Sequence, residues 1–125
     1  MRVLVVDDDP NLISLWCAVF EAHGHSCMVA QSVRDARRQL MASAFDLVLL
    51  DLYVGAESGL SVAALAGYSN PECKVVVVTG STLFPRGELF AMAPSIATVL
   101  RKPIDIEELV AVCEHHTLPS LAATA

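Results

Sequence analysis

A chain of 125 residues has the length of one ordinary domain, and its formal charge of −6 argues against direct binding of nucleic acid. Hydrophobic residues make up 54% of the sequence and charged residues only 18%, which argues against disorder through a lack of apolar surface outside the tail. No apolar run approaches the roughly 18 residues of a membrane span, and the amino terminus lacks a secretory pattern. We therefore expect a cytoplasmic protein without membrane contact.

Five runs rich in β-branched residues recur along the chain, with helix-like segments between them. They cover residues 2–6, 25–30, 45–50, 73–79 and 96–100. The third and fourth runs are apolar without alternation, which is typical of parallel strands that are covered on both faces. This pattern predicts a sheet with helices on each side.

The first helix is predicted to begin at Pro10, with Asp9 as its cap, and to end near Gly24. It carries two apolar faces rather than one. The first face consists of Ile13, Trp16, Cys17 and Phe20, and the second of Leu12, Leu15 and Val19. The second face is interpreted either as a docking surface or as the part that covers the last helix.

Four further helices follow. The second runs from the cap Ser32 to about Ala42, with its arginines expected to face solvent. The third follows Gly59, and the fourth is expected within residues 83–94. The last opens at the cap Asp105. Strands that alternate with helices predict an α/β fold with a doubly wound, five-stranded parallel sheet, as one domain over residues 1–116 with a flexible tail over 117–125.

Polar side chains stand where the strands end. Asp7 and Asp8 follow the first strand, Asp51 follows the third, Thr79 closes the fourth and Lys102 follows the fifth. In an open parallel sheet the functional crevice lies beyond the carboxyl ends of the strands, so these five side chains should converge. Clustered carboxylates repel one another unless a cation lies among them, and hard oxygen ligands suit Mg²⁺.

Magnesium, a lysine and a hydroxyl around one further carboxylate are what nucleophilic attack by an aspartate on phosphorus requires. Asp51 is the predicted nucleophile. The alternative reading makes Asp51 a cap of the loop that follows. Asp9 is interpreted as a helix cap rather than as a metal ligand.

These motifs identify a family. The stretches "VVDDDP", "LVLLDL", "VVVVTG" and "RKP", together with Gly59, resemble the receiver domain of two-component response regulators over nearly all of the first 116 residues. The resemblance implies a flavodoxin-like (CheY-like) fold with strand order 2-1-3-4-5.

The resemblance also implies roles for individual residues. The implied magnesium ligands are Asp7 (mostly through water), Asp8, Asp51 and the backbone carbonyl of Tyr53. Asp51 would accept a phosphoryl group from a phosphohistidine on a histidine kinase or phosphotransfer protein, while Thr79 and Lys102 bind phosphoryl oxygens. Such a domain is a signalling module rather than a conventional enzyme, and it acts on a downstream protein. We expect a stand-alone receiver here.

Three departures from the family pattern have consequences. Val99 replaces the usual aromatic switch residue, so an aromatic rotamer cannot report phosphorylation. Residues 81–98, which form much of the output surface in relatives, resemble the family least. Tyr53 and Ser81 flank the path of the attacking water in relatives, and we hypothesise that the bulk of Tyr53 slows loss of the phosphoryl group.

Other function classes compete with this reading. A pseudo-receiver that signals through protein contacts without phosphorylation remains an alternative because of Val99. A flavodoxin-type cofactor site would need an amide-donating loop after the first strand, where three aspartates would repel an anion. A haloacid-dehalogenase-type phosphatase would need an acid two residues after Asp51, where Tyr53 stands.

Overall fold

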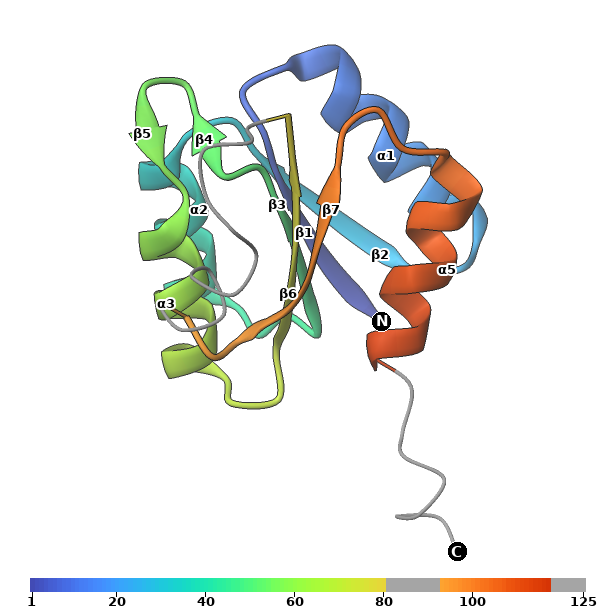
Figure 1. The fold of residues 1–125 in the computed structure, drawn as a ribbon. Coiled ribbons are helices and arrows are strands. Elements are labelled where there is room, and N and C mark those ends of the chain that lie inside the picture. The colour runs from blue at the N-terminus through green and yellow to red at the C-terminus, as the bar shows by residue number, and fades with distance from the viewer. Residues whose placement is uncertain (81–92, 118–125) are drawn as a thin grey trace, which may run out of the picture.

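Five parallel strands form one sheet in the computed structural model, which describes residues 1–80 and 93–117 (Figure 1). The strand order is β2-β1-β3-β6-β7. The strands are β1 (Arg2–Val6), β2 (Ser26–Ala30), β3 (Leu47–Leu50), β6 (Lys74–Thr79) and β7 (Ile96–Arg101). Because β6 and β7 are the fourth and fifth strands of this sheet, the predicted order 2-1-3-4-5 is confirmed.

Helices cover both faces of the sheet. Figure 1 shows α1 (Pro10–Ala22) and α5 (Ile106–Thr117) on one side, and α2 (Val33–Ala42) and α3 (Leu60–Ser69) on the other. The doubly wound α/β prediction is therefore confirmed. Most of the helix predicted within 83–94 lies outside the described residues, as do residues 118–125 of the predicted tail. None of the described helices is long and apolar enough to cross a membrane.

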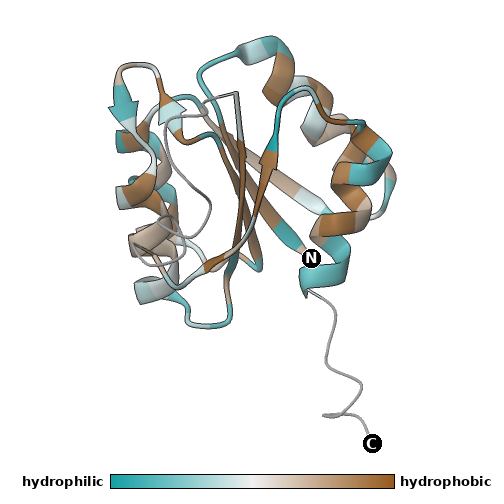
Figure 2. Cartoon of the chain, viewed as in Figure 1, coloured by the Kyte–Doolittle hydropathy of each residue, from teal (hydrophilic) through white to brown (hydrophobic). Residues whose placement is uncertain are grey.

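The two faces of the sheet bury two separate apolar clusters. Along β3, Val48 and Leu50 face the cluster under α2 and α3, while Leu47 and Leu49 face the cluster under α1 and α5. Successive side chains of a strand point to opposite faces, so a strand covered on both sides must be apolar throughout. Figure 2 shows the resulting apolar centre of the sheet.

The predicted caps are present at three helices. Asp9 Oδ1 accepts hydrogen bonds from the backbone N–H groups of Asn11 and Leu12 at the start of α1. The hydroxyl of Ser32 accepts from Asp35 at the start of α2, and Asp105 accepts from Glu108 at the start of α5. These bonds satisfy backbone donors that a helix leaves free in its first turn.

The second apolar face of α1 is only partly covered. Leu12 and Val19 are half-buried against the cluster that α1 shares with α5, whereas 47% of Leu15 is exposed. Two of the four cysteines, Cys73 and Cys113, are buried. Cys17 and Cys27 are half-buried instead, because they lie at the boundary between α1 and the edge strand β2.

A short hairpin that the sequence did not predict follows Asp51. It pairs β4 (Tyr53–Val54) with β5 (Glu57–Ser58) in antiparallel register. Gly55 has a φ of +62° at its turn, a conformation that glycine adopts without steric cost. Strands of two residues leave no periodic pattern in a sequence.

Candidate functional site

The acidic residues at the ends of β1 and β3 lie together. One carboxylate oxygen from each of Asp7, Asp8 and Asp51 lies within 4.8 Å of the other two. Thr79 closes the neighbouring strand β6, and its backbone carbonyl accepts a hydrogen bond of 3.0 Å from the backbone N–H of Lys102. The five chemical positions singled out in the sequence thus meet at the carboxyl edge of the sheet.

Lys102 joins two of the acids. Its Nζ lies 3.0 Å from Asp7 Oδ2 and 2.9 Å from Asp51 Oδ2. The same Nζ lies 5.9 Å from the centre of the Trp16 ring, and the Lys102–Pro103 peptide bond is cis. One ammonium group therefore bridges two of the three clustered carboxylates.

Burial and charge set the protonation states of Asp7 and Lys102. Burial raises the pKa of Asp7, which is only 1% exposed, and it outweighs the opposing effects of the Asp9 N–H and of Lys102. Burial alone would lower the pKa of Lys102, but its hydrogen bonds to Asp51 and Asp7 raise that pKa. Lys102 therefore stays charged at neutral pH, whereas ionised Asp7 is incompletely compensated.

Backbone donors hold the two buried acids in place. The N–H of Asp9 donates to Asp7 Oδ1 at 3.0 Å, and the N–H of Tyr53 donates to Asp51 Oδ1 at 3.3 Å. Each of these acids thus accepts one backbone donor on Oδ1 and the lysine on Oδ2. This arrangement fixes both carboxylates before any ligand binds.

The donor set fits a magnesium ion. Three carboxylates supply hard oxygen ligands, and a single ammonium leaves part of their negative charge uncompensated. Asp8 is exposed, so the cluster is open to water on one side, as suits an ion that keeps several waters.

Gly59 approaches the candidate acceptor closely. A β carbon on this residue would lie 2.6 Å from the backbone carbonyl oxygen of Asp51, closer than real Cβ contacts come. The N–H of Gly59 also donates to the carbonyl of Leu52. The resemblance had marked Gly59, but this steric reason depends on the tertiary fold and leaves no signal in the sequence.

The structure also places two further residues that the sequence analysis singled out. The side chain of Asp9 caps α1, as predicted. Val99 is buried in the core and pairs with Val77 of the adjacent strand. Ser81, part of the dephosphorylation hypothesis, lies outside the described residues.

An apolar groove borders the acidic site. It has a volume of about 380 Å³ and runs between α1 and the loop from β7 to α5. It is lined by Leu12, Leu15, Trp16, Lys102, Pro103, Ile104 and Ile106. The stem of Lys102 thus forms part of the groove while its ammonium group reaches the acids.

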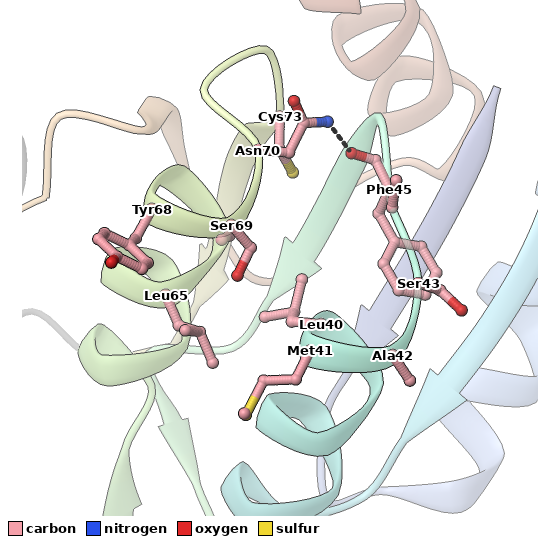
Figure 3. A pocket seen from close by; sticks show the side chains of 12 residues that line it. Leu40, Met41, Ala42, Ser43, Phe45, Leu65, Tyr68, Ser69, Asn70 and Cys73 are labelled. Atoms are coloured by element: carbon pink, nitrogen blue, oxygen red, sulfur yellow. Dashed lines mark hydrogen bonds between the residues drawn. The ribbon is translucent and has the colours of Figure 1, made fainter.

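A separate hollow of about 520 Å³ lies between the ends of α2 and α3 (Figure 3). Phe45, just before β3, lines it, so it lies at the other end of the strand that leads to Asp51. Asn70 closes it by donating a hydrogen bond to the carbonyl of Phe45. No carboxylate or cationic side chain is among its lining residues, so this hollow lacks the groups for phosphoryl chemistry.

Comparison with known proteins agrees with this geometry. Residues 3–114 match the model of the response regulator receiver domain. The chain is 32% identical over 108 residues to the alginate biosynthesis transcriptional regulatory protein AlgB of Pseudomonas putida, covering 86% of this chain and 24% of that protein. It is 28% identical over 123 residues to the transcriptional regulatory protein GlrR of Escherichia coli, covering 98% and 28%. The chain spans about a quarter of the length of these curated relatives.

Solved structures show the same fold. The receiver domain of a putative Luxo repressor protein from Vibrio parahaemolyticus superposes with a TM-score of 0.81 at 23% identity, over 93% of this chain and 88% of that one. The response regulator TrrA from Thermotoga maritima, solved in complex with Mg²⁺ and BeF, gives a TM-score of 0.79 at 25% identity, over 92% and 97%. With the acidic cluster, the bridging lysine and the family match in agreement, this chain belongs to the response regulator receiver domain family.

Proposed function

We propose that this chain accepts a phosphoryl group on Asp51 from a phosphohistidine of a histidine kinase or histidine phosphotransfer protein, and signals through phosphorylation-dependent contacts with another protein. The observation that carries the proposal is the position of Lys102, whose ammonium group bridges Asp7 and Asp51 beside the exposed Asp8. This pocket presents a fixed carboxylate nucleophile and a cation to an incoming phosphate.

In the proposed step an oxygen of Asp51 attacks phosphorus, the bond from phosphorus to the histidine nitrogen breaks, and its electron pair goes to the imidazole. Lys102 then exchanges its contact with the Asp51 carboxylate for a phosphoryl oxygen while it keeps Asp7. Thr79, at the end of β6 and only 4% exposed, offers its hydroxyl to another phosphoryl oxygen. Hydrolysis of the acyl phosphate by water returns Asp51 to its free form.

The proposed magnesium ligands are Asp7, Asp8, Asp51 and the backbone carbonyl of Tyr53. When bound, Mg²⁺ would supply the positive charge that offsets the carboxylates and the phosphoryl oxygens. The protein's own contribution is to fix Asp7 and Asp51 through backbone hydrogen bonds before the ion binds.

The apolar groove beside the site is the proposed docking place for the phosphoryl donor. Leu15, which is 47% exposed, lines it together with Trp16 and Ile104. A helix of the donor placed there would bring its phosphohistidine next to Lys102, which lines the same groove.

A pseudo-receiver function is the second candidate. The supporting observation is Val99, which occupies the place of the aromatic switch residue and is only 4% exposed. Because Val99 is buried in the core and has no aromatic ring, it cannot serve as the usual switch. Contacts with a partner protein that do not depend on phosphorylation are therefore the alternative function.

Intact-mass measurement separates the two candidates. The protein is incubated with Mg²⁺ and phosphoramidate, a small donor with a phosphorus–nitrogen bond like that of phosphohistidine. The receiver function predicts a gain of one phosphoryl group, lost with chelator or in Asp51→Asn and retained in Asp46→Asn, which makes the same change just before β3. A protein that stays unmodified with every donor contradicts the proposal and favours the pseudo-receiver.

A further inference from the structure

The outward face of α2 carries a continuous basic stripe. Arg34, Arg37, Arg38 and Met41 have the spacing i, i+3, i+4, i+7, and all four are exposed. The opposite face of the helix buries Val33, Ala36 and Leu40. We name these four exposed residues the arginine stripe. It holds three of the eight basic residues of a chain whose formal charge is −6.

The charge of the stripe is poorly compensated within the described part of the chain. Arg38 pairs with Asp35 one turn earlier, but its side chain remains 80% exposed. No carboxylate of the described residues lies within ion-pair distance of Arg34 or Arg37. Like charges at these spacings oppose helix formation, so folding alone gives no reason for the cluster.

A groove runs beside the stripe. It has a volume of about 580 Å³ and lies between α2 and the hairpin strand β5. Besides the stripe, it is lined by Val33, which is 5% exposed, and by Glu57. Three basic side chains and one carboxylate therefore border a groove with an apolar floor, and its net charge remains positive.

Met41 adds an apolar contact at the end of the stripe. Its side chain is 78% exposed and lines both this groove and the hollow between α2 and α3 (Figure 3). Arginine and methionine are among the residues enriched at protein interfaces. An exposed methionine next to unpaired guanidinium groups therefore suits a ligand with both acidic and apolar side chains.

We propose that the arginine stripe docks a short acidic segment of a partner protein, with carboxylates on Arg34 and Arg37 and an apolar side chain on Met41. Guanidinium groups bind carboxylates with two parallel hydrogen bonds. The stripe is only about 10 Å long at the helical rise per residue, and the acidic body of the protein repels a long polyanion. A short acidic peptide fits this surface better than a nucleic acid does.

This docking surface is distinct from the phosphoryl site. α2 and α1 cover opposite faces of the sheet. The apolar groove that Lys102 lines lies beside α1. Binding to the stripe is therefore tested on the unphosphorylated protein without a phosphoryl donor, so failure of this proposal is distinguishable from failure of the proposed function.

Fluorescence anisotropy with a labelled synthetic peptide of glutamate and leucine residues tests the proposal. We expect saturable binding that weakens as salt is raised, and a loss of affinity of about tenfold or more in the double variant Arg34→Ala and Arg37→Ala. Met41→Gln should weaken binding of the peptide less than the double arginine variant does. Lys74→Ala, which removes an exposed cation elsewhere, should bind as the wild type does.

Three results would overturn the proposal: equal binding of a peptide with glutamine in place of glutamate, unchanged affinity in the double variant, or preferential binding of a single-stranded oligonucleotide. Both arginines are exposed and alanine favours helices, so the variant should fold, which circular dichroism verifies. The double variant Arg34→Gln and Arg37→Gln repeats the test with side-chain length retained.

Discussion

A β carbon on Gly59 would lie 2.6 Å from the carbonyl oxygen of Asp51 and 3.0 Å from a methyl carbon of Leu50. The start of α3 is thereby pressed against the loop that carries the proposed phosphoryl acceptor. The φ of Gly59 is −77°, so any residue could adopt this backbone conformation. Space alone requires glycine here.

Gly59→Ala should therefore destabilise the protein by about 1–3 kcal/mol through overpacking and should slow phosphorylation of Asp51. Urea denaturation measures the first effect and intact mass the second. The control is Gly80→Ala, because nothing lies within 4 Å of a β carbon placed at Gly80. Equal stability of the two variants would contradict the steric argument.

The ionised carboxylate of Asp7 should lower the stability of the folded protein when no divalent cation is present. A carboxyl whose pKa is raised by folding contributes stability below its ordinary value of 3.8 and loses it as the pH rises through the folded pKa. At about pH 7.5 in chelator, Asp7→Asn should thus be more stable than the wild type by about 1 kcal/mol. Mg²⁺ should stabilise the wild type more than this variant.

Asp8→Asn is the matched comparison. Asp8 is exposed, so its removal should leave the stability in chelator nearly unchanged while it weakens the stabilisation by Mg²⁺. Urea denaturation of the wild type and of both variants, each with chelator and with Mg²⁺, provides the six stabilities that are compared. If Asp7→Asn is destabilising in chelator, the inference that its charge is incompletely compensated fails.

Asp9 should contribute to stability but not to metal affinity. Asp9→Ala removes the cap of α1 and should cost about 1 kcal/mol. The backbone N–H that Asp9 donates to Asp7 remains, so the carboxylate cluster keeps its geometry. Trp16, the single tryptophan, lies beside Lys102 and provides a fluorescence signal for titration with Mg²⁺. A large loss of magnesium affinity would show Asp9 to be more than a cap.

The main sheet and the convergence of Asp7, Asp51 and Lys102 were predictable because both follow from local pattern. Unbroken apolar runs predict parallel strands, and the carboxyl ends of such strands share one edge. The bridging geometry of Lys102 and the requirement for Gly59 were not predictable. Lys102 meets acids that lie 95 and 51 positions away in the sequence, and Gly59 meets the Asp51 carbonyl through the folding of the intervening loop, so a periodic pattern encodes neither contact. The hairpin after Asp51 escaped prediction because each of its strands has two residues.

The side chain of Tyr53 provides the last prediction. It is half-buried and packs against the core cluster under α2 and α3, while its backbone N–H donates to Asp51. A bulky ring two residues from the acceptor should restrict the approach of water to an acyl phosphate. Tyr53→Asn should therefore lose its phosphoryl group faster than the wild type, by about threefold or more.

Phosphorylated protein freed of donor and followed by intact mass gives this rate directly. Tyr53→Phe should behave as the wild type, because ring bulk rather than the hydroxyl group blocks water. Tyr68→Asn makes the same substitution at a tyrosine of α3 that is 88% exposed and serves as the control. Tyr53→Asn changes only the side chain, so the backbone carbonyl that is proposed as a magnesium ligand is retained. A faster loss of the phosphoryl group in this variant would therefore reflect easier access of water. If Tyr53→Asn and the wild type decay at the same rate, the ring does not shield the phosphoryl group.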